Sequence, residues 1–271
     1  MMVDLPTGFQ NLDTLIGGLQ NSDVFILFSP PLIGEISLAS SIALNAATTY
    51  QCRIGLFSAE MNKYQVVQRL LAMSADVDLY HLRTGWITDD EYRRVTQAAR
   101  MLSKTSIWID DRADLTPAKL WQRARQLARE HGVTLLLIDG AHLLQPNADD
   151  KGERQNVQEM SRSLKALARE LRLPIAVLLP MPDPRAHHRS KDRLHFDQQD
   201  CSLAKDTRHV LFLYRDTFSP SLAANKSMVM ITVTIVKHRN GLVTEVALSR
   251  QAEPIPSRDA EQFPSRKDAL S

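Results

Sequence analysis

Short apolar segments that alternate with helix-forming segments constrain the fold of this chain most strongly. The runs Val24–Phe28, Ile54–Ser58 and Thr134–Asp139 are brief and almost wholly apolar, as strands buried in a parallel sheet are. Helices are expected between them, for example over Ser37–Thr49. Because alternating strands and helices form a mainly parallel sheet covered by helices, the sequence predicts an α/β fold.

Local signals place further elements. Thr88 and Glu91 form a capping box that opens a helix to about Ser103. Thr116-Pro117 opens another helix, which runs to His131-Gly132. The remaining expected elements are a helix at Glu153–Leu171, strands at Ile107–Ile109, Ile175–Leu179, Arg208–Arg215 and Met228–Val236, an Asn240-Gly241 hairpin turn and a return strand at Leu242–Leu248.

One domain accounts for most of the chain. The 271 residues suffice for a single large α/β domain, which we expect over residues 1–250. From Gln251 to Ser271 the chain is rich in Pro, Ser and charge and has no hydrophobic periodicity, so we expect a disordered tail there.

Composition excludes few functions. The apolar content of 44% and the net charge of +2 are ordinary for a soluble protein, and a DNA-binding surface would have to be a local patch. Cys52 and Cys201 have no metal-ligand spacing, and we expect no metal site. Without a signal peptide, a spanning segment or a disulfide framework, the protein is expected to be cytoplasmic and without membrane partners.

The segment between Ser29 and Ser37 has the layout of a phosphate-binding loop but not its chemistry. A strand, a tight loop and a helix N-terminus together cradle nucleotide phosphates. A working loop continues from its glycine with Lys and then Ser or Thr. Here Gly34 is followed by Glu35 and Ile36. Gly34, Glu35, Ile36 and Ser37 are therefore candidate nucleotide-binding positions of a degenerate loop.

Two further acids, Glu60 and Asp139, follow strand ends. Ligands of open parallel sheets bind beyond the carboxyl ends of the strands, so we expect Glu35, Glu60 and Asp139 to converge on one site. Each acid also has a structural interpretation. Asp139 could cap a turn, Glu60 could be an ordinary surface acid, and Glu35 could favour the first turn of a helix.

The order of the motifs resembles the ATPase domain of the DnaB-type hexameric replicative helicases, which have a RecA-like P-loop NTPase fold. The resemblance extends from about Thr7 to Leu248. It rests on the segments Thr7–Asp13, Gly17–Leu19, Phe57–Met61, Arg83–Gly85, Ile109–Asp111, Leu115–Pro117, Leu137–Asp139, Ser161–Ala168, Tyr214–Asp216 and Lys237–Gly241.

The resemblance implies a role for each matching residue. Glu60 stands at the position of the catalytic glutamate that polarises the attacking water, and Asp139 at that of the aspartate that supports Mg²⁺. Lys237 and Arg239 match the basic pair that reaches the γ-phosphate of the neighbouring subunit's ATP. The family's loop ends in Gly-Lys-Thr, so Glu35 and Ile36 remove both the lysine and the hydroxyl. An ATPase-deficient protein that needs no cofactor is the resulting expectation.

The family's DNA-binding groups are retained in part. Arg185, Arg189, Lys191 and Arg193 lie in a segment that corresponds to a DNA-facing loop, which would follow single-stranded DNA with positive charge. A solvated loop without a ligand has the same composition. Pro180 stands where the family has a glutamine that senses the γ-phosphate, so that relay is expected to be absent.

Three functions are compatible with these residues. The first is a DNA-replication protein that binds a replicative helicase, single-stranded DNA or both, as a partner or regulator of the helicase or as a self-oligomer. The second is an active ATP-dependent helicase that uses Mg-ATP with an atypical loop, in which Lys63 or Lys205 replaces the missing lysine. The third is a regulator without nucleotide or DNA ligands. Because the chain begins almost at the ATPase domain, we expect neither the collar domain nor the linker helix of the full-length family members.

Overall fold

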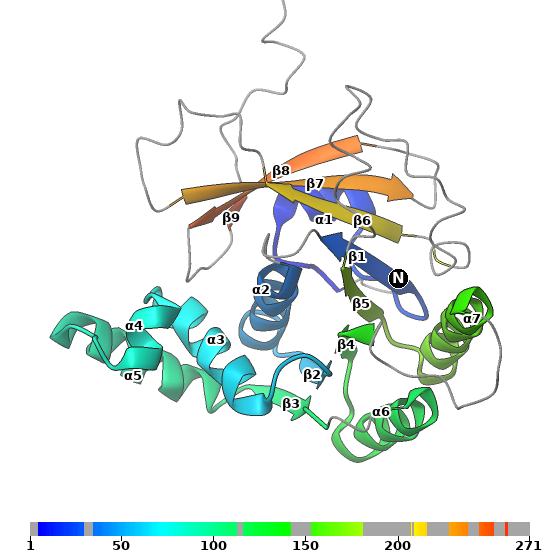
Figure 1. Ribbon diagram of the computed structural model, residues 1–271, viewed down its shortest axis with the longest axis horizontal. Coiled ribbons are helices and arrows are strands. Elements are labelled where there is room, and N and C mark those ends of the chain that lie inside the picture. Colours follow the sequence, from blue (N-terminus) through cyan, green and yellow to red (C-terminus); the bar gives the residue numbers. More distant parts are fainter. Residues whose placement is uncertain are drawn as a thin grey trace, which may run out of the picture.

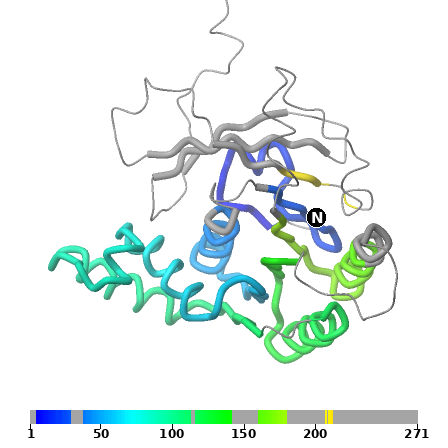
Figure 2. The backbone as a smooth tube through the Cα atoms, viewed as in Figure 1, coloured from blue at the N-terminus to red at the C-terminus, as the bar shows by residue number. Residues whose placement is uncertain are grey.

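The computed structural model describes most of the chain. Its backbone is described at residues 5–29, 35–112, 116–141, 153–180, 207, 209–215, 228–237, 244–251 and 258–259. Side chains are described at residues 5–28, 38–112, 116–141, 160–179, 207 and 209–211. Figure 2 draws the remainder in grey.

Within these residues the strands form one sheet, in the order β3-β2-β4-β5-β1-β6-β7-β8-β9. The strands are β1 Val24–Ser29, β2 Arg53–Ser58, β3 Ser106–Asp110, β4 Leu135–Asp139, β5 Ile175–Pro180, β6 His209–Arg215, β7 Met228–Lys237, β8 Thr244–Gln251 and β9 Arg258–Asp259. The helices are α1 Gln10–Ile16, α2 Glu35–Thr48, α3 Lys63–Ala75, α4 Leu79–Thr84, α5 Asp89–Leu102, α6 Pro117–His131 and α7 Glu153–Leu171.

The first six strands of this order are parallel. β1 lies between β5 and β6, and β4 lies between β2 and β5, each pair in parallel register. β3 completes the group as the parallel neighbour of β2. This arrangement confirms the predicted α/β fold, and it sets the carboxyl ends of all six strands on one edge of the sheet.

Helices cover both faces of the parallel sheet (Figure 1). On one face α1, α2 and α3 pack on alternate strand residues, including Phe25, Leu27 and Leu137. On the other face α6 and α7 pack on the intervening residues, including Ile26 and Ile138. The alternation follows from the pleat of a strand, which points successive side chains to opposite faces. Both faces are therefore apolar, which explains the almost continuous hydrophobic runs of the central strands.

Side-chain caps define the helix starts. The predicted capping box of Thr88 and Glu91 is present at α5, and the Thr116 hydroxyl accepts a hydrogen bond from the Lys119 N–H at α6. A second capping box, formed by Asn62 and Gln65, opens α3. This box is visible in the sequence, yet α1, α3 and α4 were not predicted. Their short or weakly periodic apolar patterns explain the omission.

The C-terminal part extends the sheet with antiparallel strands. β7 pairs with β6 and β8, and β8 pairs with β9. The predicted turn at Asn240-Gly241 lies outside the described residues. Gln251 ends β8 and residues 258–259 form β9, so these residues are strand rather than the predicted disordered tail. The rest of the predicted tail lies outside the described residues, and its disorder stays a prediction.

Helices long and apolar enough to cross a membrane are absent from the described part of the chain.

A buried ion pair joins α7 to the start of β1. Lys165 donates a hydrogen bond to Asp23, and both side chains are largely buried. His209 of β6, which is fully buried and stacks on Phe25, lies with its Nδ1 4.0 Å from the Asp23 carboxylate. The pair fixes α7 against the sheet end that lies opposite the carboxyl ends of the strands. Removing its cation would leave a carboxylate buried without its main counter-charge.

Lys165→Met should destabilise the protein by about 3–5 kcal/mol, because Asp23 would then be buried without its ammonium partner. The matched control is Arg125→Met, which breaks the exposed pair that Arg125 makes with Glu170 at 2.6 and 2.9 Å. That pair also joins α7 to a neighbouring element, but exposed pairs contribute only about 0–1 kcal/mol. Urea unfolding of both variants measures the difference. Equal losses would contradict the assignment of Lys165 as a core residue.

Candidate functional site

The carboxyl ends of β2 and β4 form the described part of the candidate site. Ser58 and Asp139 are direct neighbours in the parallel register of these strands. One residue further on, the Ala59 N–H donates to the Asp139 carbonyl oxygen at 3.1 Å, so the ladder continues past the end of β2. Glu60 follows immediately. The register thus brings Glu60 and Asp139, which are 79 residues apart in the printed numbering, to the same corner of the sheet.

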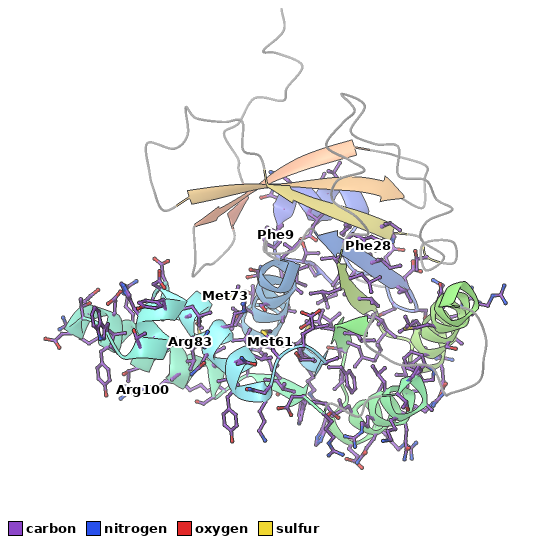
Figure 3. All side chains as sticks on the ribbon, viewed as in Figure 1. Phe9, Phe28, Met61, Met73, Arg83 and Arg100 are labelled. Carbon is purple, nitrogen blue, oxygen red and sulfur yellow. The ribbon has the colours of Figure 1, made fainter. Side chains whose placement is uncertain are left out.

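The Ser58 hydroxyl links the two strand ends. Its oxygen lies 3.4 Å from Asp139 Oδ2 and accepts a hydrogen bond from the Met61 N–H at 3.2 Å. Ser58 is 1% exposed, so these bonds are shielded from water. Met61, labelled in Figure 3, packs against the core cluster that includes residues of α2 and α3. The turn that carries Glu60 is therefore fixed on both sides of that residue.

Asp139 is an unusual carboxyl group. It is 7% exposed, and its pKa is raised to about 6, mainly by burial and to a smaller extent by the Glu60 carboxylate. The hydrogen bond from Ser58, the positive charge of Arg69 and the Gly140 N–H act in the opposite direction. Glu60 itself is exposed. Two carboxyl groups thus interact at this edge, as the sequence predicted, although their catalytic roles stay a prediction.

Arg69 is a site residue that the sequence analysis missed. It lies on α3, and its positive charge acts on Asp139. Its Nε atom is buried within the fold. The Asn62 and Gln65 capping box would have revealed α3, and an arginine two turns into a helix that begins beside Glu60 would then have been a candidate.

The predicted phosphate-binding loop is described only at its two ends. β1 ends at Ser29 and α2 begins at Glu35, so a strand leads through a short connection into a helix, as predicted. Gly34 lies outside the described residues, as do the side chains of Glu35, Ile36 and Ser37. The convergence of Glu35 with the two other acids stays a prediction.

Other predicted site residues fall in the undescribed parts. Arg239 and the DNA-binding candidates Arg185, Arg189, Lys191 and Arg193 lie there, and only the backbone of Lys237, the last residue of β7, is described.

Of the two lysines considered as replacements in the loop, one is placed by the structure. The Lys63 ammonium lies over the ring of Tyr64, 5.5 Å from its centroid. Its neighbours there include Val67 and Ile109, in a groove of about 410 Å³ between α3 and β3. Because β3 is the end strand of the sheet, this contact is made away from β1. Lys205 lies outside the described residues.

The adjacent acids Asp110 and Asp111 have structural partners. Asp110 accepts a hydrogen bond from Arg123 at 2.6 Å, and Asp111 accepts one from the Lys63 N–H at 2.7 Å, in the first turn of α3. Asp110 thus ends β3 in an ion pair with α6, and Asp111 holds the first turn of α3. Among the described residues, no group of three or more His, Cys, Asp and Glu side chains could hold a metal ion.

Comparison with known protein families gives one strong match. The model of the DnaB-like helicase C terminal domain matches residues 4–255. The replicative DNA helicase DnaB of Geobacillus stearothermophilus is 35% identical over 247 residues, which cover 90% of this chain and 54% of the relative. The replicative DNA helicase DnaC of Bacillus subtilis (strain 168) is 34% identical over the same shares. The chain spans about half the length of the curated relatives it matches.

Solved structures agree with this match. A DnaB-like replicative helicase, solved in a study that includes its interactions with primase, has a TM-score of 0.81 at 25% identity, covering 93% of this chain and 62% of that one. A second solved structure, which is an ATPase domain, has a TM-score of 0.77 at 25% identity, covering 90% of this chain and 87% of that one. The likeness includes the parallel sheet and its flanking helices.

Asp139→Asn should change how stability depends on pH. The pKa of Asp139 rises from 3.8 to about 6 on folding, so the folded protein holds this proton more tightly than the unfolded chain. The free energy of unfolding should therefore fall by about 2–3 kcal/mol as the pH rises from 4 to above 6. The asparagine variant should lose this drop, matching the unmodified protein at pH 4 and exceeding it at pH 7.5. Urea unfolding between pH 4 and pH 7.5 measures the free energy of unfolding of both proteins. Parallel curves of this free energy against pH would contradict the prediction.

Proposed function

The chain belongs to the family of DnaB-like helicase C-terminal domains. We propose that this protein acts as a partner or regulator of a replicative helicase and does not itself hydrolyse ATP. One observation carries this proposal. α2 begins with Glu35, directly after Gly34, where the family's phosphate loop has its lysine. A carboxylate thereby stands at the helix end that would face a polyanion.

The charge reversal is large enough to decide whether nucleotide binds. At a separation of about 4 Å and an effective dielectric constant near 20, one unit-charge contact is worth roughly 4 kcal/mol, attractive for lysine and repulsive for glutamate. Ile36 supplies no hydroxyl for Mg²⁺. Without nucleotide the same Glu35 is favourable, since acidic groups stabilise a helix N-terminus. The loop therefore suits a protein that works without ATP of its own.

The neighbouring acids add to this effect. Glu60 and Asp139 lie together at the same edge of the sheet, and Asp139 is buried. The predicted convergence of Glu35 would bring a third acidic residue to this edge, while Arg69 acts on Asp139 from α3. A bound triphosphate would bring further negative charge to this edge without the lysine that normally balances it.

Residues that would act on a neighbour's nucleotide are kept. Lys237 and Arg239 match the basic pair of the family, and such residues can accelerate a neighbouring subunit's hydrolysis by about 10³–10⁵. The relatives that the chain matches are named replicative DNA helicases. These two points support a role in DNA replication, in which the protein lies beside a helicase subunit. Arg185, Arg189, Lys191 and Arg193 would add contacts to the phosphates of single-stranded DNA.

An active helicase with an atypical loop is the second candidate. The acid pair favours it, because Ser58, Glu60 and Asp139 supply oxygen atoms of the kind that Mg²⁺ prefers. In that case Mg-ATP would be the cofactor, with Asp139 holding the metal and Glu60 orienting the attacking water. Measurement of nucleotide binding distinguishes the two candidates.

Isothermal titration with Mg-ATP should give no saturable binding to the unmodified protein. Glu35→Lys combined with Ile36→Thr should restore binding in the micromolar range, because the double change returns both the cation and the hydroxyl. Glu35→Gln is the matched control, since it removes the repulsion without supplying a cation, and it should bind far more weakly than the double variant. Micromolar binding by the unmodified protein would refute the proposal and favour the active helicase.

Capture of the replicative helicase from the same cell by the immobilised protein should depend on Arg239. Arg239→Ala should weaken capture about tenfold, because truncating a central interface arginine costs more than about 1 kcal/mol. Arg129→Ala, which removes an exposed arginine from α6, should leave capture unchanged. Absence of capture by the unmodified protein would favour a regulator with a different partner.

A further inference from the structure

We propose that Gly140 is a positioning residue, because its missing side chain lets Glu60 lie against the end of β4 beside Asp139. The inference deepens the proposed function and rests on it only in placing Glu60 and Asp139 in the functional site. It concerns the packing of the protein without nucleotide. The role of Gly140 can therefore be refuted while the proposed function holds, and the proposed function can be refuted while the role of Gly140 holds.

The space over Gly140 is filled by the turn that follows β2. A Cβ atom on Gly140 would lie 3.0 Å from Ala59 Cβ, 3.1 Å from Glu60 Cγ and 3.4 Å from the Glu60 nitrogen. Gly140 also has a φ of +76°, which residues with a side chain rarely adopt. Glycine is thus favoured here twice, by backbone conformation and by close approach.

The turn has little freedom to withdraw from an added side chain. Its backbone is joined to β4 through the Ala59 N–H and the Asp139 carbonyl oxygen, and Ser58 bonds both Asp139 and the Met61 N–H. The Glu60 side chain is exposed and can rotate. A side chain at position 140 would therefore press on Ala59 Cβ, which moves only with the backbone, and would displace the Glu60 Cγ, which can turn about its side-chain bonds. The Glu60 carboxylate would then move relative to Asp139, whose pKa it raises in the present arrangement.

Gly85 is a glycine that is favoured only by its backbone conformation and not by close approach of other atoms. It ends α4 with a φ of +77°, almost the same as that of Gly140, but a Cβ there would meet nothing within 4 Å. Gly85→Ala therefore imposes the same backbone penalty without the contact. The two glycines form a matched pair that separates conformational strain from the positioning of Glu60.

A double-mutant cycle tests the inference. Gly85→Ala should raise the unfolding equilibrium constant about tenfold, equally in the presence of Glu60 and in the Glu60→Ala background. Gly140→Ala should raise it by a factor at least threefold greater in the presence of Glu60 than in the Glu60→Ala background, where the Cγ contact is gone. Equal factors in the two backgrounds would overturn the inference, because the penalty of Gly140→Ala would then be independent of Glu60.

A nuclear Overhauser measurement provides a readout that strain alone would not change. The unmodified protein should show a cross-peak between the Glu60 γ protons and the Gly140 α protons. The Glu60 γ signals should shift in Gly140→Ala and stay unchanged in Gly85→Ala. If Gly140→Ala does not fold, the unmodified protein decides the matter, since the absence of that cross-peak would refute the contact.

Discussion

The parallel ladder between β2 and β4 is the interaction on which the described site depends. It sets Ser58 opposite Asp139, and the hydrogen bond from the Ala59 N–H extends the pairing beyond the strand itself. A slip of one residue would turn Asp139 to the other face of the sheet, where it would meet the apolar packing of α6 and α7. Burial of both sheet faces prevents that slip, so the core and the site are specified together.

Electrostatics at this edge support the proposal that the protein does not hydrolyse ATP. Acidic groups in such a site are tolerated when a lysine and a metal ion balance them. Here the sequence supplies Glu35 in place of the lysine, and Arg69 acts on Asp139 from the side of α3. A site of this kind can keep the shape of its family while losing affinity for a triphosphate. Its shape depends on the pairing of β2 with β4, whereas its affinity for phosphate depends on the net charge of its side chains.

Local chemistry in the sequence predicted much of the fold. Apolar runs located the parallel strands, and the Thr88 and Thr116 caps located two helices, because these signals act over a few neighbouring residues. The ionic contact of Asp23 with Lys165 joins positions 142 residues apart, and such pairs require the tertiary structure. The approach of Glu60 to Gly140 was hidden for the same reason. Convergence of Glu60 and Asp139 was predictable, since parallel strands end on one edge.

Helix α3 begins three residues after Glu60 and is anchored where it starts. Asn62 caps it, and its first N–H is held by Asp111 just beyond the end of β3. The same helix packs with α4 and α5 at the rim of the molecule (Figure 1). α3 therefore connects this rim to the turn that carries Glu60, so the packing of α4 and α5 and the position of the acid pair depend on the same helix.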